Sequence, residues 1–253
     1  MPTDVDYLRT GNVLEMPRGN LLPISVLEIA LKRANDIFVD ITNVAPYIYE
    51  LLGLRNLSAF VGAAFARELQ DASTGLLLLN PHQDGYPDLL LLDTIGTSAF
   101  NKVKHRIRAK EPFSPFPEGG IEIKATVGDV PSETQLTKKG LEKPKIGETR
   151  VDMITGISWK AHHRETNNLL SLIWDFRNSV PAIMVVSYCS KLEESDWGKI
   201  VQPKEGGGRT TSVSIMSKNG VIKMLRNTLL VIDDSRYISL VEKQMKESLN
   251  LLS

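Results

Sequence analysis

Two carboxylates and one lysine have side-chain types and spacings that suit metal-assisted chemistry. Asp88 precedes the apolar run 89–92. Glu122 and Lys124 lie two residues apart in the alternating stretch 121–126. Because strand side chains alternate between faces, Glu122 and Lys124 are expected to share one face of a strand, with apolar residues on the other. If Asp88 opens a neighbouring strand, the three groups meet. The two carboxylates then form a hard oxygen site for Mg²⁺, and the lysine can hold a water molecule or an anionic oxygen.

Short strands must position these groups. The run 89–92 is apolar throughout, which is typical of a strand covered on both faces. Residues 75–79 predict a strand before it, and the segment 80–85, which contains Pro and Gly, predicts the turn between the two. His82 and Asp84 lie in this turn, and Asp84 is expected to serve turn chemistry because Asp before Gly favours tight turns.

A helix predicted at about 59–71 carries a further carboxylate. Asn56 or Ser58 is available as its N-cap. Glu68 falls on the same side of this helix as three apolar residues, so we expect it to point toward the core. A carboxylate there needs a partner, which is either the charged site or a neighbouring cation. Glu50, in the preceding helix, is the alternative to Glu68.

The order Pro87-Asp88, a spacer, and then Glu122-x-Lys124 resembles the core of the PD-(D/E)xK nuclease superfamily. The length of the chain is similar to that of a type II restriction endonuclease. The resemblance covers residues 57–126 and extends to about residue 190. It implies an α/β fold with a mixed central β-sheet flanked by helices, which is a restriction-endonuclease-like core with an N-terminal helical region.

The resemblance also implies site residues, a cofactor and an activity. The catalytic residues would be Asp88, Glu122, Lys124 and Glu68, with Mg²⁺ bound by Asp88 and Glu122. The implied activity is sequence-specific hydrolysis of phosphodiester bonds in double-stranded DNA by a homodimer of a type II restriction system, without a nucleotide cofactor. No P-loop, nucleophile elbow, dinucleotide fingerprint or zinc-protease motif competes with this interpretation.

Two alternatives stay open. One is a structure-selective repair or recombination nuclease on the same core. The other is a non-catalytic nucleic-acid-binding or structural α/β protein, in which Asp88, Glu122 and Lys124 form a satisfied ion-pair cluster.

Alternating cations in the spacer suggest a DNA contact. Every second position of residues 101–110 is a cation, namely Lys102, Lys104, Arg106, Arg108 and Lys110. In a strand, all of these cations face one side and form a basic ribbon suited to phosphates. The alternative is a solvated surface segment.

A second set of polar residues lies further along the chain. His162, His163 and Arg164 follow a strand predicted at 152–160, and Arg209 lies in a glycine-rich loop. DNA contact is the functional interpretation of these residues. The alternative for the histidines is a polar turn leading into a helix, because a metal site needs a further spaced ligand.

Composition limits the class of protein. The 253 residues are 42% hydrophobic and 24% charged, which is typical of a globular protein. Thirty Lys and Arg balance thirty Asp and Glu, which argues against a protein that coats nucleic acid regardless of sequence but not against a nuclease with a basic cleft. We expect a single nuclease domain with three regions. These are an N-terminal helical region (1–56), a catalytic core (57–190) and a C-terminal extension of strand and helix (191–253).

The single cysteine and the apolar runs bear on the cellular compartment. Cys189 has no partner for an intramolecular disulfide, and its apolar surroundings indicate a buried thiol. No apolar run reaches membrane-spanning length, and residues 1–10 lack the apolar core of a signal peptide. We therefore expect a cytoplasmic, intracellular protein of a prokaryote with no membrane partner.

Periodicity predicts the remaining elements. Residues 1–20 are expected to form an irregular arm and 127–150 a lysine-containing loop. Predicted helices lie at 24–38, 44–54, 169–176, 221–226 and 235–252. Predicted strands lie at 181–188, 211–216 and 229–233.

Overall fold

The computed structural model describes residues 5–161, 166–202 and 212–252. Four of the residues expected to contact DNA lie outside the described residues, namely His162, His163, Arg164 and Arg209.

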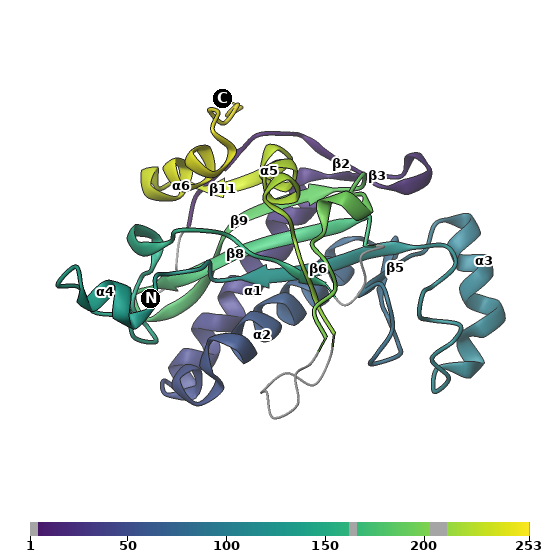
Figure 1. Ribbon diagram of the computed structural model, residues 1–253. Helices are drawn as coiled ribbons and strands as arrows, with labels where there is room; N and C mark the ends of the chain where they lie inside the picture. The colour runs from purple at the N-terminus through teal and green to yellow at the C-terminus, as the bar shows by residue number, and fades with distance from the viewer. Residues whose placement is uncertain (1–4, 162–165, 203–211, 253) are drawn as a thin grey trace.

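Among the described residues, a seven-stranded mixed sheet has the strand order β1-β11-β9-β8-β6-β5-β4 (Figure 1). Its strands are β1 (Tyr7–Arg9), β4 (Leu77–Leu79), β5 (Leu89–Leu91), β6 (Gly120–Thr126), β8 (Leu169–Arg177), β9 (Val180–Cys189) and β11 (Thr228–Ile232). β6 and β8 run parallel, and the other neighbouring pairs are antiparallel. Two small sheets pair β2 (Val13–Glu15) with β3 (Leu21–Pro23), and β7 (Lys160–Ala161) with β10 (Ser214–Ile215).

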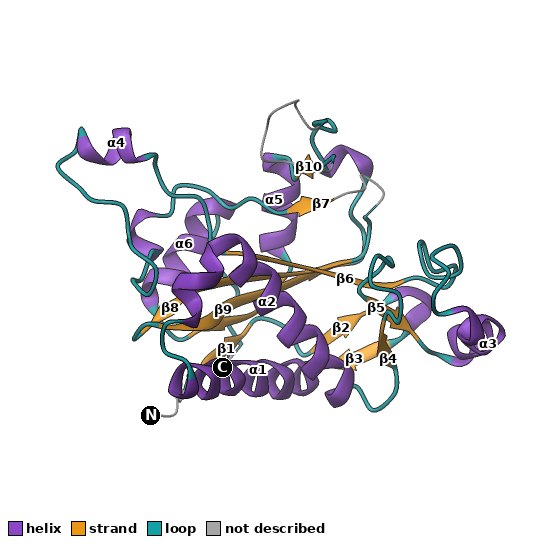
Figure 2. Ribbon diagram, turned by 90° about the horizontal axis from the view of Figure 1, so that it is seen from below, coloured by secondary structure: helices purple, strands orange, loops and turns teal. Residues whose placement is uncertain are grey.

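Helices flank this sheet (Figure 1, Figure 2). α1 (Ile24–Val44) and α2 (Ile48–Ala72) pack on one face, and α5 (Lys218–Arg226) and α6 (Ser235–Met245) pack on the other. α3 (Thr94–Val103) and α4 (Glu133–Thr137) lie at opposite ends of the sheet. The predicted mixed α/β sheet flanked by helices is therefore confirmed. None of the helices in the described ranges combines the length and the apolarity needed to cross a bilayer.

The two faces of the sheet form two hydrophobic cores that meet at β8. Leu170 and Trp174 lie in the core built with α1 and α2, whereas Leu169 and Ile173 lie in the core built with α5 and α6. Burial of one such side chain contributes about 1.5–3 kcal/mol. β8 is thus held from both sides, and it fixes the neighbouring strand β6, which pairs with it from Glu122 to Thr126.

The helix predicted at 169–176 is wrong, because these residues form most of strand β8. Every residue from Leu169 to Phe176 is buried. A segment that is covered on both faces has a continuous apolar run, and periodicity alone does not distinguish a buried strand from a buried helix. The strand predicted at 181–188 is confirmed as β9, which forms a hairpin with β8.

The strand predicted at 152–160 is also wrong. A 3₁₀ turn occupies Val151–Met153, and β7 begins only at Lys160. Between them, Ile154 and Trp159 are buried against the α5–α6 side of the sheet. This segment is therefore held by side-chain packing and by one isolated antiparallel bridge between Gly156 and Asp129, not by a continuous strand.

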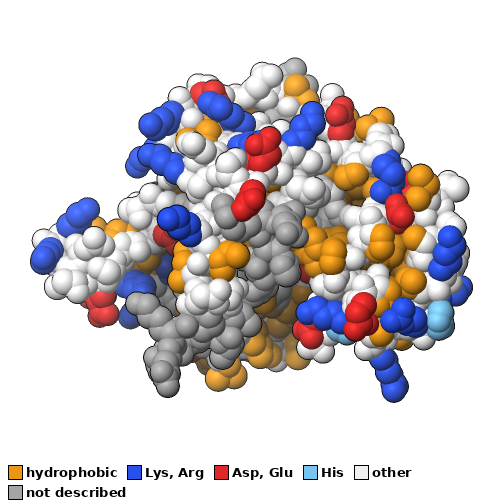
Figure 3. Space-filling model, turned by 45° about the vertical axis from the view of Figure 1, so that its right-hand side comes forward, with side chains coloured by type: hydrophobic (Ala, Val, Ile, Leu, Met, Phe, Trp, Pro, Cys, Tyr) orange, Lys and Arg blue, Asp and Glu red, His pale blue; other side chains and the backbone are white. Residues whose placement is uncertain are grey.

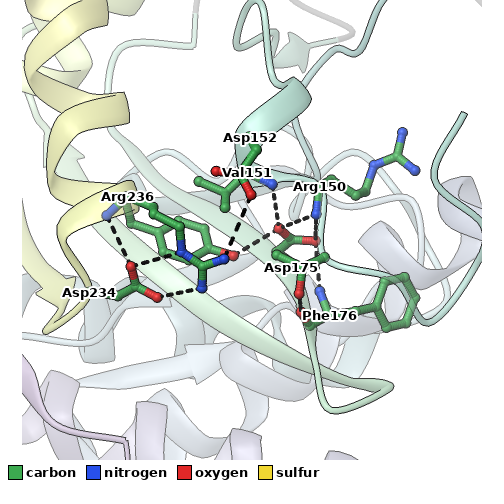
Figure 4. A network of polar contacts seen from close by, with 9 residues as sticks. Arg150, Val151, Asp152, Asp175, Phe176, Asp234 and Arg236 are labelled. Atoms are coloured by element: carbon green, nitrogen blue, oxygen red, sulfur yellow. Dashed lines mark hydrogen bonds and ion pairs between the residues drawn. The ribbon is translucent and has the colours of Figure 1, made fainter. Parts of the chain in front are cut away.

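A buried carboxylate on β8 holds the 3₁₀ turn in place (Figure 4). The Asp175 carboxylate accepts hydrogen bonds from the backbone N–H groups of Arg150, Val151 and Phe176, at 2.8, 3.0 and 2.8 Å. The Tyr237 hydroxyl of α6 donates a fourth, at 2.8 Å. In Figure 4 the Arg150 side chain points away from Asp175, so the partner from this residue is its backbone N–H.

The basic segment 101–110 does not form a strand. Asp93 caps α3 by accepting a hydrogen bond from the Gly96 N–H at 2.8 Å, and the helix is followed by a 3₁₀ turn at Lys104–Arg106. In these conformations alternate residues do not share a face, so the basic ribbon is wrong. The side chains expected to form it are all exposed, namely Lys102, Lys104, Arg106 and Arg108.

The N-terminal part is more regular than predicted. Residues 7–9 form β1, which pairs with β11 and is the edge strand on that side of the sheet. The two helices predicted near 44–54 and 59–71 belong to α2, which is interrupted at Gly53, where φ is 66°. Ser58 is not an N-cap, because its hydroxyl donates to the Leu54 carbonyl inside the helix. The predicted elements at 221–226, 229–233 and 235–252 are confirmed as α5, β11 and α6, although α6 ends at Met245.

Candidate active site

Asp88, Glu122 and Lys124 meet at the edge of β6. The backbone N–H of Ile123 donates to Asp88 Oδ2 at 2.7 Å, and the backbone N–H of Asp88 donates to Glu122 Oε2 at 3.2 Å. Lys124 Nζ contacts Glu122 Oε1 and lies 4.0 Å from Asp88 Oδ2. The convergence predicted from the strand pattern is therefore present.

The register of β5 and β6 explains this arrangement. β5 pairs with β6 only at Leu89–Ile121 and Leu90–Gly120, so the Ile123 N–H on this edge of β6 is free to bind Asp88. Gly120 permits the close approach, because a Cβ at this position would lie 1.8 Å from the Leu89 carbonyl oxygen and φ is 157°.

Asn80 holds the turn that leads to Asp88. Its side-chain Nδ2 donates to the carbonyl oxygens of Pro87 and Phe113, at 3.0 and 2.9 Å. Its Oδ1 accepts from the His82 N–H at 3.0 Å, and its backbone N–H donates to the Asp88 carbonyl at 2.8 Å. One amide side chain therefore joins both ends of the turn and fixes the start of β5.

Burial and charge act together on the three groups. The side chains of Glu122, Lys124 and Asp88 are 10%, 23% and 40% exposed, so Asp88 is the group most open to solvent. Burial, reinforced by the charge of Asp88 and opposed by Lys124, raises the pKa of Glu122 to about 7. Burial lowers the pKa of Lys124, but Glu122 and Asp88 outweigh it and the net shift is upward. Both shifts favour bound protons, and a metal cation can take the place of such protons.

A pocket of about 510 Å³ opens beside these residues. Its floor on α2 consists of small residues, namely Ser58, Ala59, Gly62, Ala63 and Ala66. Asp88 and Lys124 line it together with Lys160, and His82 and Gln83 of the preceding turn also contribute. The charged groups therefore border a space that can admit part of a ligand.

The residues present fit a magnesium ion. Asp88 and Glu122 supply carboxylate oxygens, which are the donors that Mg²⁺ prefers, and Mg²⁺ commonly takes only one or two protein carboxylates, with water and substrate phosphates as its other ligands. Within the described part of the chain, no third Asp, Glu, His or Cys side chain completes a metal-binding cluster with them. This composition suits a metal shared with a substrate better than a closed structural site.

The helix glutamates do not join the site. Glu68 is half-buried on α2 but does not line the pocket, because small residues occupy the part of α2 that does. Glu68 is thus only partly covered by the fold, and its predicted catalytic role stays a prediction. Glu50 is exposed near the start of α2 and does not line the pocket either.

The predicted DNA-contacting cations are separate from the pocket. Lys102, Lys104, Arg106 and Arg108 lie in α3 and the turns after it, and none of them lines the pocket. Arg106 lies 3.7 Å from Glu111. On the described part of the face in Figure 3, Lys and Arg side chains alternate with acidic and hydrophobic ones and form no continuous stripe.

Two site residues carried no clear signal in the sequence. Asn80 lies in a predicted turn, where asparagine is common, and its long-range hydrogen bonds are visible only in the folded chain. Lys160 is 36 positions from Lys124, and only the packing of β7 near β6 brings the two to one pocket.

Comparison with known proteins found no match to this chain. No family model, no curated protein and no solved structure matches this chain.

Proposed function

We propose that this protein is a Mg²⁺-dependent endonuclease that hydrolyses phosphodiester bonds of double-stranded DNA at specific sequences, on a PD-(D/E)xK-type core. The observation that carries the proposal is the meeting of Asp88, Glu122 and Lys124 beside an open pocket. A cluster in which carboxylates outnumber cations, and which borders an open space, leaves negative charge for a bound cation to neutralise. Here two carboxylates share one lysine, and Asp88 is partly exposed.

Each group has a role in this chemistry. Asp88 and Glu122 hold the metal ion, and the Ile123 N–H keeps the Asp88 carboxylate in position. Bound Mg²⁺ supplies charge stabilisation at the scissile phosphate and lowers the pKa of a water ligand. Lys124, once its contact with Glu122 is shared with substrate, orients the attacking water or stabilises the charge that develops on the phosphate oxygens.

Sequence recognition and symmetry belong to the same proposal. Base readout requires segments that reach a groove of the duplex, and the loops at 104–119 and 127–150 extend from the two ends of the sheet. A homodimer would present two sites to a palindromic target, as two-fold symmetry requires. The proposed setting is a restriction system in the cytoplasm of a prokaryote.

Digestion of a sequenced, supercoiled plasmid tests the proposal. We expect discrete fragments in Mg²⁺ or Mn²⁺ and no cleavage in a chelator. Calcium should support binding without efficient cleavage, because its looser oxygen shell activates water poorly. A smear of fragments would favour the structure-selective nuclease, and cleavage that persists in chelator would exclude the metal-dependent mechanism.

Matched substitutions locate the activity. Asp88→Asn should abolish cleavage because it removes a carboxylate ligand. Asp84→Asn is the control, since Asp84 is exposed in the same turn and does not line the pocket. Equal loss of activity in the two variants would point to a general effect on the turn and would contradict the assignment of Asp88.

A further inference from the structure

One lysine lines the pocket without belonging to the carboxylate cluster. Lys160, the first residue of β7, is exposed and has neither a hydrogen bond nor an ion pair with another described residue through its side chain. The pocket's other lysine, Lys124, is occupied by Glu122. Lys223, on α5, is paired with Asp196 at 2.8 Å. Among the described residues, therefore, no acidic side chain pairs with Lys160, whose backbone is held in β7.

The neighbours of Lys160 fix its direction. Trp159 is buried, its indole N–H donates to the Leu172 carbonyl at 3.5 Å, and its own carbonyl accepts from the Met216 N–H at 2.9 Å. Ala161 is also buried and pairs with Ser214 of β10. Because strand side chains alternate, the residue between two inward-facing neighbours faces outward, which here is into the pocket.

The charges around the pocket suggest what Lys160 binds. Asp88 and Glu122 are already balanced in part by Lys124, and a metal ion would balance them further. A DNA strand placed at Asp88 brings further phosphates beyond the one that reacts. A lysine ammonium is a compact point charge that binds single phosphate oxygens well, and Lys160 is a pocket-lining lysine with no ion pair to another described residue.

We propose that Lys160 is a phosphate-binding residue that holds a non-reacting backbone phosphate of the DNA strand entering the pocket. This inference rests on the proposed function and names the part of the substrate that Lys160 contacts. Lys160 positions the strand and takes no part in the chemical step. Its removal should therefore affect binding and KM, and leave kcat nearly unchanged.

Binding of a fluorescently labelled duplex of mixed sequence in Ca²⁺, followed by anisotropy between about 50 and about 200 mM salt, tests this inference. Lys160→Ala should lower the slope of log affinity against log salt by about one and weaken binding about tenfold. Lys160→Arg should keep the slope. Lys243→Ala is the matched control, an exposed lysine on α6 outside the pocket, and it should behave as the wild type.

The outcomes separate this inference from the proposed function. If the wild type cleaves DNA but Lys160→Ala keeps the wild-type salt slope, the inference is wrong and the function stands. If the wild type binds duplex with the Lys160-dependent slope but never cleaves, the function is wrong and the inference stands. An equal fall of slope in Lys243→Ala, or a fall of kcat without a change in slope, overturns the role of Lys160. A wild type that binds no DNA overturns both.

Discussion

Two buried carboxylate clusters of this protein have opposite arrangements of partners. Asp175 is fully buried and receives three backbone N–H groups and the Tyr237 hydroxyl, so donors surround it. Glu122 is almost as buried, but it accepts only one backbone N–H, that of Asp88; its other polar neighbours are the Asp88 carboxylate and Lys124, and the cluster borders an open pocket. A carboxylate that the chain itself satisfies serves the fold. Two carboxylates brought together with one lysine leave room for a ligand that carries positive charge.

The largest expected difference between the clusters is in activity. Glu122→Gln should reduce cleavage by about 10⁴-fold or more, because a metal ligand is lost, while the folded state remains. The substitution also removes a carboxylate whose charged form is disfavoured chiefly by burial, so the metal-free variant should be at least as stable as the wild type. Plasmid cleavage and chemical denaturation measure the two effects. Unfolding of this variant would instead assign the cluster a structural role.

The Asp175 cluster should respond in the opposite way. Asp175→Ala leaves the Arg150 and Val151 N–H groups and the Tyr237 hydroxyl buried without their acceptor. We expect a loss of about 3–5 kcal/mol in the free energy of unfolding. Activity per folded molecule should stay close to that of the wild type. Urea denaturation compared with cleavage rates corrected for the folded fraction is the measurement, and a stable but inactive variant would contradict the comparison.

The pH dependence of stability sharpens the comparison further. The folded state of the metal-free protein holds a proton on Glu122 up to about pH 7, whereas the unfolded chain releases it near 4.5. Between these values the folded state binds more protons, so the contribution of this group to stability falls as the pH rises from about 4.5 to about 7. The loss is on the order of 2–3 kcal/mol.

Glu122→Gln should remove this part of the pH dependence, because an amide does not titrate in this range. Denaturation curves of both proteins at pH 5 and pH 8, recorded in a chelator, provide the test. Parallel pH dependence in the two proteins would mean that the proton is held elsewhere. Asp175 also has a pKa raised by burial, and its contribution is common to both proteins.

The smallest expected effect concerns one hydroxyl. Tyr237→Phe removes the single donor that α6 gives to Asp175 and leaves the three backbone donors in place. We expect a loss of about 1 kcal/mol in the free energy of unfolding, with unchanged cleavage. Urea denaturation measures the first and plasmid digestion the second. A loss as large as that of Asp175→Ala would mean that the tyrosine, rather than the backbone donors, carries the cluster.

The sequence predicted the carboxylate–lysine group better than the elements around it. That Glu122 and Lys124 share a face could be predicted, because strand alternation is a local rule. That Asp88 lies beside them could be predicted because the turn at 80–85 and the apolar run 89–92 are both recognisable in the sequence. The secondary structure of residues 152–177 was predicted wrongly, as a strand at 152–160 and a helix at 169–176. Its shape depends on Asp175 binding backbone groups about 25 positions away and on burial of β8 from both sides, and neither leaves a periodic pattern.

The interpretation of residues 101–110 as a basic ribbon was wrong for a different reason. Charge alternation is visible in any conformation, but it places side chains on one face only in a strand. The cap of α3 at Asp93 decides the conformation, and Asp93 is also held by Arg18 at 2.8 Å and by Asn20 at 2.9 Å. These two residues come from the N-terminal part of the chain, so the local pattern could not reveal them.

The pairing of β1 with β11 has a consequence for how the protein is made. Tyr7 of β1 pairs with Ile232 of β11, so β1 can join the sheet only after β11 has been synthesised. During synthesis, at roughly 5–20 residues per second, β9 leaves the ribosome well before β11 covers its outer edge. The strands that carry Asp88 and Glu122 are synthesised earlier and pair within a short stretch of chain. Local structure around the carboxylate–lysine group can thus form on the nascent chain, and closure of the far side of the sheet is a late event.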